Sequence, residues 1–269
     1  MWQSNPDVQL TSGGKSCLAA AVLVVSSCFV LLDCGSIAVA AEVKLLSAVA
    51  LKPVMDALVP EFEKTSGHKV TISYGTVGAL SDRLQKGEPA DVAIVAGAQI
   101  DNLQTQGKIV GGSRVNIARV GVGAVVRKGA AKPDISSVEA FKHTMLSAQS
   151  ILYPDPAGGG PPGIWMSGLL DRLGIGAEMK PKTRLANPGP DFYDSIAIGE
   201  VEIGFNQISE NLAALNVDPV GPLPTAIQNY TQFAAGIGSS STQVDAAKGL
   251  IKFLTSPTST ALFKAKGYE

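Results

Sequence analysis

One stretch, residues 73–97, constrains the fold of this 269-residue chain more than any other. Residues 70–74, which overlap the start of this stretch, form an alternating, β-branched segment typical of a strand. A small-residue turn at 75–78 leads into a helical run at 79–85, and a second apolar strand follows at 91–96. The order strand, turn, helix, strand predicts a parallel βαβ unit and therefore an α/β fold.

The turn from Gly75 to Gly78 allows two interpretations. A glycine-bounded turn that enters a helix presents backbone N–H groups at the positive end of the helix dipole, where anions bind. Alternatively, the two glycines only make a tight turn possible. The turn alone does not decide between an anion site and a purely structural role.

The first forty residues have the pattern of a secretory signal peptide. Lys15 precedes an apolar run at 17–32, and residues 38–40 (Ala-Val-Ala) form a small-x-small cleavage site, so the mature chain is expected to begin at Ala41. A lipidation site at Cys28 is the alternative. It would leave apolar residues 29–32 beyond the cut, so cleavage and secretion are favoured.

Cysteine and charge exclude several classes of function. Cys17, Cys28 and Cys34 all lie in the segment to be removed, so the mature chain is predicted to have no disulfide, thiolate metal site or cysteine nucleophile. Without Asp7, Lys15 and Asp33, the 22 basic and 23 acidic residues become 21 of each. No basic stripe is present, which argues against nucleic acid and anionic membranes as partners. Only two histidines occur, and no metal or cofactor is predicted.

The turn at 75–78 has two counterparts along the chain. Ala48–Ala50 follows the strand at 42–47, and the glycine-rich loop at 154–163 follows the strand at 150–153. Ligands of open parallel sheets bind at the carboxyl ends of the strands, so these turns are predicted to border one cleft. Asn187, Asn206 and Gln207 also lie at predicted strand ends, and Ser136 is expected to cap the helix that follows it.

The alternation of strands and helices falls into two blocks, which predicts two lobes with a ligand cleft between them. Residues 1–40 are assigned to the signal peptide. Residues 41–120 together with 237–269 are assigned to lobe 1, and residues 121–236 to lobe 2. The last two helices are expected to return to the first lobe.

These features together resemble the periplasmic molybdate-binding components of ABC importers, which are type II periplasmic binding proteins. The resemblance rests on the SxxxL turn at 47–51, the run at 73–80 with Gly-Glu-Pro-Ala-Asp-Val at 87–92, the loop after Tyr153, and the ending at 253–268. It implies a two-lobed α/β fold, a periplasmic location, a small anionic ligand, and ABC permease and ATPase subunits as partners. The expected state is a monomer.

The departures from that family concern its ligand. Serine hydroxyls of the first two turns hold the oxyanion in the molybdate binders, and the corresponding residues here are Ala50 and Val77. A family tyrosine corresponds to Asn206. Each lost donor to a buried anion costs about 1–3 kcal/mol, so an organic acid is predicted instead of molybdate. The predicted ligand-binding residues are Ala48, Val49, Ala50, Thr76, Val77, Gly78, Ala157, Gly158, Gly159, Gly160, Asn187, Asn206 and Gln207.

The resemblance also supports an enzyme as the alternative, because aconitate isomerase is similar to these binding proteins. Moving an allylic proton needs a single general base. The sequence does not identify that base, and each candidate also has a plain structural interpretation. The candidates are His68, His143, Tyr74, Tyr153, Asp155 and Asp191, with Arg83 and Arg184 as possible carboxylate clamps.

Overall fold

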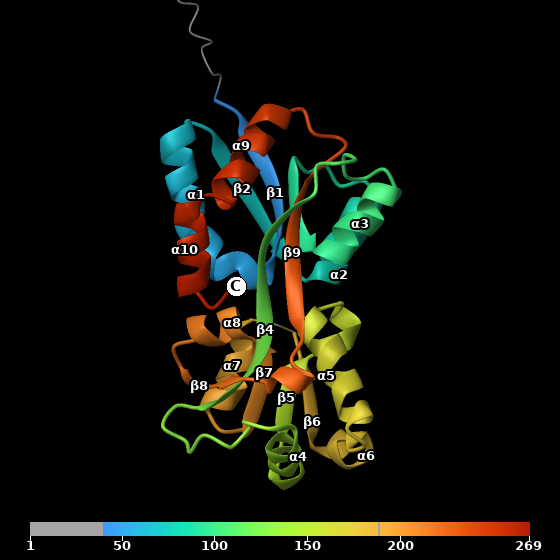
Figure 1. Ribbon diagram of the computed structural model, residues 1–269, viewed down its shortest axis with the longest axis vertical. Coiled ribbons are helices and arrows are strands. Elements are labelled where there is room, and N and C mark those ends of the chain that lie inside the picture. Colours follow the sequence, from blue (N-terminus) through green and yellow to red (C-terminus); the bar gives the residue numbers. More distant parts are fainter. Residues whose placement is uncertain (1–39, 188) are drawn as a thin grey trace, which may run out of the picture. The chain divides into compact units, whose positions relative to one another are not determined.

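The computed structural model describes residues 40–187 and 189–269. The predicted signal peptide and the lipidation alternative at Cys28 lie outside the described residues, apart from Ala40. The described residues belong to one compact unit, Val39–Glu269, which has two lobes (Figure 1). Its strands form a single sheet of nine within the described residues. Across the sheet the order is β2 (Lys69–Gly75), β1 (Glu42–Ala48), β3 (Val92–Ala96), β9 (Tyr230–Ile237), β4 (Val115–Arg127), β7 (Ile203–Gln207), β5 (Ile151–Pro154) and β6 (Thr183–Ala186), with β8 (Val217–Pro222) paired to β4.

The first lobe is built from parallel βα units that begin at the amino end. Its strands β1, β2 and β3 pair in parallel. The βαβ unit predicted at 73–97 is present as β2, α2 and β3. The elements of this lobe are β1 (Glu42–Ala48), α1 (Lys52–Ser66), β2 (Lys69–Gly75), α2 (Val77–Gln85), β3 (Val92–Ala96), α3 (Gly97–Thr105), α9 (Val244–Leu254) and α10 (Pro257–Ala265).

The second lobe repeats the alternation with β5 parallel to both β6 and β7. Its strands run antiparallel where β7 and β8 meet β4. The elements of this lobe are α4 (Val138–Ser147), β5 (Ile151–Pro154), α5 (Pro161–Arg172), α6 (Gly176–Met179), β6 (Thr183–Ala186), α7 (Pro190–Ala197), β7 (Ile203–Gln207), α8 (Ile208–Ala213) and β8 (Val217–Pro222).

Strand β4 (Val115–Arg127) runs through both lobes (Figure 1). Its first half pairs with β9 (Tyr230–Ile237), and from Val122 onward it pairs with β7. The strand begins at Val115 because β9 offers backbone partners from there, which a local pattern does not reveal.

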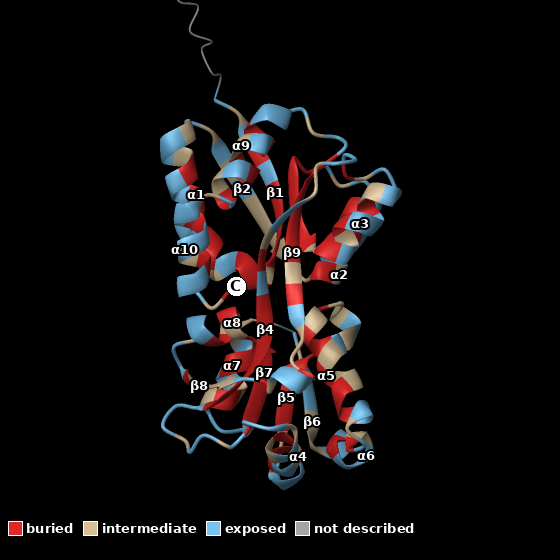
Figure 2. Cartoon of the chain, in the orientation of Figure 1, coloured by how far each residue is buried: buried red, intermediate tan, exposed pale blue. Residues whose placement is uncertain are grey.

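The buried apolar side chains divide into separate clusters, and Figure 2 colours the buried residues of each element red. One cluster contains the strands of the first lobe together with side chains of α9, Phe263 and Tyr268, so the last helices pack onto the first lobe as predicted. Two further clusters contain the buried side chains of residues 122–227. The exact lobe boundaries given above stay a prediction.

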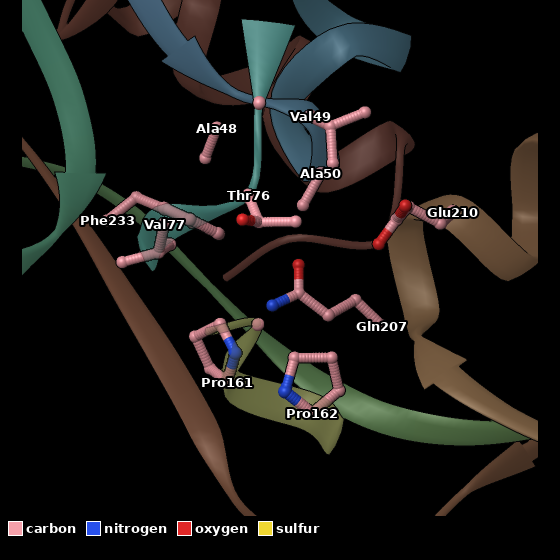
Figure 3. A pocket seen from close by; sticks show the side chains of 12 residues that line it. Ala48, Val49, Ala50, Thr76, Val77, Pro161, Pro162, Gln207, Glu210 and Phe233 are labelled. Carbon is pink, nitrogen blue, oxygen red and sulfur yellow. The ribbon is translucent and has the colours of Figure 1, made fainter. Parts of the chain in front are cut away.

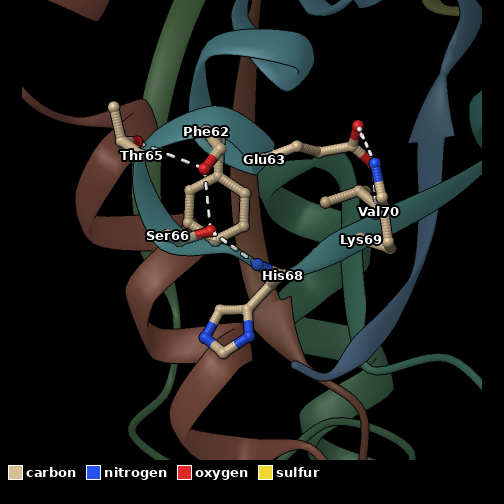
Figure 4. A network of polar contacts seen from close by, with 7 residues as sticks. All are labelled: Phe62, Glu63, Thr65, Ser66, His68, Lys69 and Val70. Atoms are coloured by element: carbon tan, nitrogen blue, oxygen red, sulfur yellow. Dashed lines mark hydrogen bonds and ion pairs between the residues drawn. The ribbon is translucent and has the colours of Figure 1, made fainter. Parts of the chain in front are cut away.

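Two helix ends bear on the sequence predictions. At the end of α1, Gly67 has a φ of 74° and Ser66 Oγ accepts from the His68 N–H (Figure 4). The His68 ring accepts from the Ala41 N–H at 3.1 Å, which is a structural role. The cap of α4 is Ser137, not Ser136 as predicted. The Ser136 N–H instead donates to Asp134, which places the helix start one residue later.

Candidate functional site: a cleft between the lobes

The turns at the ends of β1 and β2 face the second lobe across a narrow cavity (Figure 3). The first turn contributes Ala48, Val49 and Ala50, which lead through a short 3-10 segment into α1. The second contributes Thr76 and Val77 at the start of α2. The cavity has a volume of about 20 Å³, room for about one water-sized group. The lobes are therefore close together around the site.

The start of α2 bonds directly to the loop of the other lobe. Thr76 caps α2, because its hydroxyl oxygen accepts from the Ala79 N–H at 3.2 Å. The same hydroxyl donates to the Gly158 carbonyl at 2.6 Å, and the Gly78 N–H donates to the Gly159 carbonyl at 3.3 Å. Two donors expected to hold an anion thus bind carbonyl groups of the protein in this conformation.

The glycine-rich loop reaches this position through a tight turn. Asp155 accepts from the Ala157 N–H at 2.9 Å, and Gly159 has a φ of 68°, a left-handed conformation that favours glycine. Helix α5 then begins at Pro161 and Pro162, both of which line the cavity. Prolines have no N–H, so this helix end offers fewer donors to an anion than an ordinary one.

Gln207, at the end of β7, is the buried polar side chain that lines the cavity from below Thr76 (Figure 3). It is 2% exposed. Its Nε2 donates to Thr231 Oγ1 at 3.2 Å, while its Oε1 is buried without a hydrogen-bond partner among the described residues. Rotation of the amide by 180° would let Oε1 accept from Thr231 and turn the N–H groups toward the cavity. The Gln207 amide can therefore form a further hydrogen bond with a ligand.

The neighbouring Asn206 is committed to a network inside the second lobe. It is fully buried. Its Nδ2 donates to the Tyr193 hydroxyl at 3.2 Å, and its Oδ1 accepts from the Gln207 N–H at 2.8 Å. The Tyr193 hydroxyl in turn donates to Asn211 Oδ1 at 3.2 Å. Asn206 therefore positions β7 and α8 and is not among the side chains that line the cavity.

Glu210, in the first turn of α8, lines the cavity without having been predicted from the sequence, as do Gly75, Pro161, Pro162 and Phe233. Its carboxylate points toward Ala50 and Gln207 (Figure 3). Burial raises the pKa of Glu210 to about 7, against a smaller opposing effect of a hydrogen bond with Asn206. Glu210 also lines a larger adjoining cavity of about 400 Å³ that reaches Lys52 on α1. Its sequence signal was only its place shortly after the predicted strand end at Gln207, which does not by itself predict burial at a cavity.

The structure brings seven of the thirteen predicted ligand-binding residues to the cavity and three more to its edge. The edge residues are Gly78, Gly158 and Gly159, which meet across the cleft. Ala157, Asn187 and Asn206 are not among the lining residues. Without a bound ligand, the set as a whole stays a prediction. The seven predicted residues that line the cavity are Ala48, Val49, Ala50, Thr76, Val77, Gly160 and Gln207.

The arginines proposed as carboxylate clamps are engaged elsewhere. Arg83 forms an ion pair with Glu88 and donates to Ser73, and Arg184 pairs with Glu200 at 3.6 Å. Neither lines the cavity.

Several other residues that were candidates for the general base do not line the cavity. Tyr153 is buried in the core of the second lobe, His143 is exposed on α4, and the Tyr74 hydroxyl donates to Asp56 at 3.3 Å. Asp191 lies in the first turn of α7. Within residues 40–187 and 189–269, no cluster of three or more histidine, cysteine, aspartate or glutamate side chains could hold a metal ion.

The profile of one protein family, described as bacterial extracellular solute-binding protein, matches residues 43–269. The chain belongs to this family. The chain is 32% identical over 231 residues to the aconitate isomerase of a Pseudomonas species, with 84% of this chain and 86% of that protein covered. It is 30% identical over 248 residues to the molybdate-binding protein ModA of Azotobacter vinelandii, with 88% and 93% covered.

The same architecture occurs among solved solute-binding proteins. The periplasmic molybdate-binding protein of Azotobacter vinelandii superimposes with a TM-score of 0.71 at 22% identity, over 84% of this chain and 98% of that one. This likeness confirms the predicted two-lobed α/β fold of periplasmic binding proteins. Among the described residues, none of the helices combines the length and apolar character needed to cross a membrane.

Proposed function

We propose that this solute-binding protein captures a small organic acid in the cleft between its lobes. The observation that carries the proposal is the chemistry of the cavity lining. Thr76 supplies its single side-chain hydroxyl, and Gln207 and Glu210 are its other polar side chains. An organic acid has planar carboxylates and an apolar carbon frame, which suits a cavity of this mixed character.

A tetrahedral oxyanion would find fewer hydrogen-bond donors in this cavity. Ala50 and Val77 are each 5% exposed and line the cavity where the molybdate-binding family has serines by the resemblance described above. The binding of a buried anion is weakened by about 1–3 kcal/mol for each hydrogen bond that is lost.

The cellular role that we propose follows the family. The relatives include proteins named as periplasmic and molybdate-binding. We therefore propose secretion through the signal peptide at 1–40, action as a monomer in the periplasm, and delivery of the ligand to an ABC permease and its ATPase. Closure of the lobes would present the loaded cleft to that permease.

A ligand panel tests this proposal. The mature chain from Ala41 is melted alone and with citrate, cis-aconitate, trans-aconitate, molybdate, tungstate, sulfate or phosphate. A ligand at about a hundred times its dissociation constant stabilises the folded state by about 2.7 kcal/mol, a clear shift in melting temperature. Stabilisation by a carboxylate is the expected result. Stabilisation by molybdate or tungstate alone would overturn the proposal.

A second candidate function is isomerisation of an unsaturated tricarboxylate such as aconitate in the same cleft. The observation that favours it is the partly buried Glu210 carboxyl at the cavity wall, with a pKa near neutrality. The 32% identical relative is named as an aconitate isomerase. Incubating purified protein with trans-aconitate and following the formation of cis-aconitate by proton NMR tests turnover directly.

A further inference from the structure

We propose that Glu210 is the residue that moves a proton on the bound ligand, as general base and then as general acid. The inference rests on the proposed binding of an unsaturated carboxylate in the cleft, and it assigns the catalytic group of the second candidate function.

The position of Glu210 is central to the space that a ligand can fill. The side chain lines both the narrow cavity at the turns of the first lobe and the adjoining cavity of about 400 Å³. Val49 is the other residue shared by the two cavities. A ligand with carboxylates at both ends of a short carbon chain could place one end at Thr76 and the other toward Lys52. Its middle carbons would then lie beside Glu210.

The groups that face Glu210 come from four elements. Lys52 and Asp56 on α1 share its larger cavity but pair with each other at 2.8 Å, and both are half exposed. Tyr193 and Asp194 come from α7. Asn206 at the end of β7 and Tyr268 near the carboxyl terminus complete the surroundings, since Asn206 lowers the pKa of Glu210 and the charge of Glu210 raises the pKa of Tyr268.

These surroundings leave the proton of Glu210 free to exchange near neutral pH. Burial raises the pKa of Tyr193 and of Tyr268 well above the usual range, so both phenols stay neutral. No ion pair to Glu210 is formed within the described part of the chain. With its own pKa raised to about 7, Glu210 has both protonation states populated at neutrality, which is the condition for efficient transfer in both directions.

The step balances without any further reactant. The Glu210 carboxylate takes a proton from the methylene carbon next to the double bond. The electron pair of that C–H bond forms the new double bond, and the electrons of the old double bond move to its far carbon. That carbon takes a proton from the Glu210 carboxylic acid. The double bond has then moved by one position, and the carboxylate is restored.

The test compares Glu210→Gln with the wild-type chain in D₂O. Glutamine has nearly the same shape and no exchangeable carboxyl proton. Glu61→Gln is the matched control, because Glu61 is exposed on α1 and undergoes the same chemical change. Calorimetry with trans-aconitate measures binding. Proton NMR measures conversion to cis-aconitate and deuterium incorporation at carbon.

The expected result is that the wild type and Glu61→Gln bind, convert and exchange. Glu210→Gln should bind within about threefold of the wild type but lose conversion and exchange by a factor of about 10²–10⁴, the usual contribution of a general acid-base residue. The wild-type rate should also rise through pH 7 as the carboxylate forms, and Glu210→Asp should retain a reduced rate.

Two outcomes would overturn the assignment and leave organic-acid binding intact. One is that Glu210→Gln converts and exchanges at the wild-type rate. The other is that the wild type binds trans-aconitate without exchange or conversion. Failure of the wild type to bind any carboxylate in the panel would overturn the proposed function itself, and the role of Glu210 with it.

Discussion

The Thr76 hydroxyl of the first lobe donates a 2.6 Å hydrogen bond to the Gly158 carbonyl of the second. Next to it, the Gly78 N–H donates to the Gly159 carbonyl at 3.3 Å. These bonds use the donors at the start of α2, which is the end of a helix that attracts anions. A ligand that binds at α2 must therefore replace loop carbonyls with its own oxygens, and the loop at 156–160 must shift as the ligand enters.

The close approach of Gly78 and Gly159 predicts the effect of a single methyl group. A Cβ at position 78 would lie 2.9 Å from the Gly159 Cα, closer than real Cβ contacts allow. Gly78→Ala is expected to disfavour the closed arrangement, and because a ligand must displace the same loop contact, ligand affinity should rise by up to about tenfold. Small-angle scattering with and without ligand, together with calorimetry, measures both effects.

The matched control for that variant is Gly249→Ala. Gly249 lies in α9, and a Cβ there would meet only a Phe62 atom at 4.0 Å. Alanine in a helix is favoured over glycine by about 1 kcal/mol, so this variant should be more stable and bind as the wild type does. Equal affinity of both variants would show that the glycine contact has no part in closure.

Restoring hydroxyls to the first two turns should shift the ligand preference. Ala50→Ser with Val77→Thr adds two hydroxyl groups at cavity-lining positions. With about 1–3 kcal/mol for each hydrogen bond to a buried anion, molybdate affinity is expected to rise at least tenfold, while carboxylate affinity does not rise. Calorimetry with both ligands checks this. No gain for molybdate would mean that these positions do not face the anion.

The connection between the lobes predicts a stability effect at Gln228. Its Oε1 accepts from the Val122 N–H at 2.8 Å and its Nε2 donates to the Val122 carbonyl at 2.9 Å, where β4 changes partner from β9 to β7. Gln228→Leu leaves both backbone groups without these partners. The free energy of unfolding should fall by about 1–3 kcal/mol, as measured by urea denaturation.

Gln106→Leu is the control for this effect, since Gln106 is exposed at the end of α3. It should change the free energy of unfolding by less than about 0.5 kcal/mol, as surface substitutions usually do. If the Gln228 variant were as stable as this control, the paired hydrogen bonds to Val122 would contribute nothing to the connection.

The sequence was sufficient for the fold but not for the polar contacts of the site. Alternating strands and helices predicted the α/β fold, and small-residue turns at 48–50 and 75–78 marked the walls of the cavity. The bond from Thr76 to Gly158 joins residues 82 positions apart, and nothing local reveals it. Asn206 and Gln207 look equivalent in sequence, yet their side chains point to opposite sides of an alternating strand.

The burial of Glu210 could not be predicted from its local sequence either. A glutamate in the first turn of a short helix is typical of an exposed surface, where it is stabilised by the helix dipole. Here the turn at Ala50 and the tail at Tyr268 approach α8, since the Ser209 hydroxyl donates to the Ala50 carbonyl at 3.3 Å and the Tyr268 hydroxyl donates to the same oxygen. The burial of the carboxyl is thus created by segments far away in the chain.

That burial predicts how stability changes with pH. The folded-state pKa of Glu210 is about 7, above its ordinary value of 4.5, so the folded state holds a proton that the unfolded state releases. Stability is therefore fully present below about pH 4.5 and falls as the pH rises toward 7. One pKa unit corresponds to about 1.4 kcal/mol, which gives a loss of roughly 3 kcal/mol as an upper bound because the residue is partly exposed.

Glu210→Gln removes this dependence, because an amide does not titrate. Between pH 5 and pH 8 the wild type and Glu61→Gln should lose melting temperature in parallel, while Glu210→Gln should lose less and be more stable than both at pH 8. Thermal melts at four pH values in one buffer system give the comparison. Parallel curves for all three proteins would mean that the Glu210 carboxyl is well solvated and titrates near its ordinary pKa.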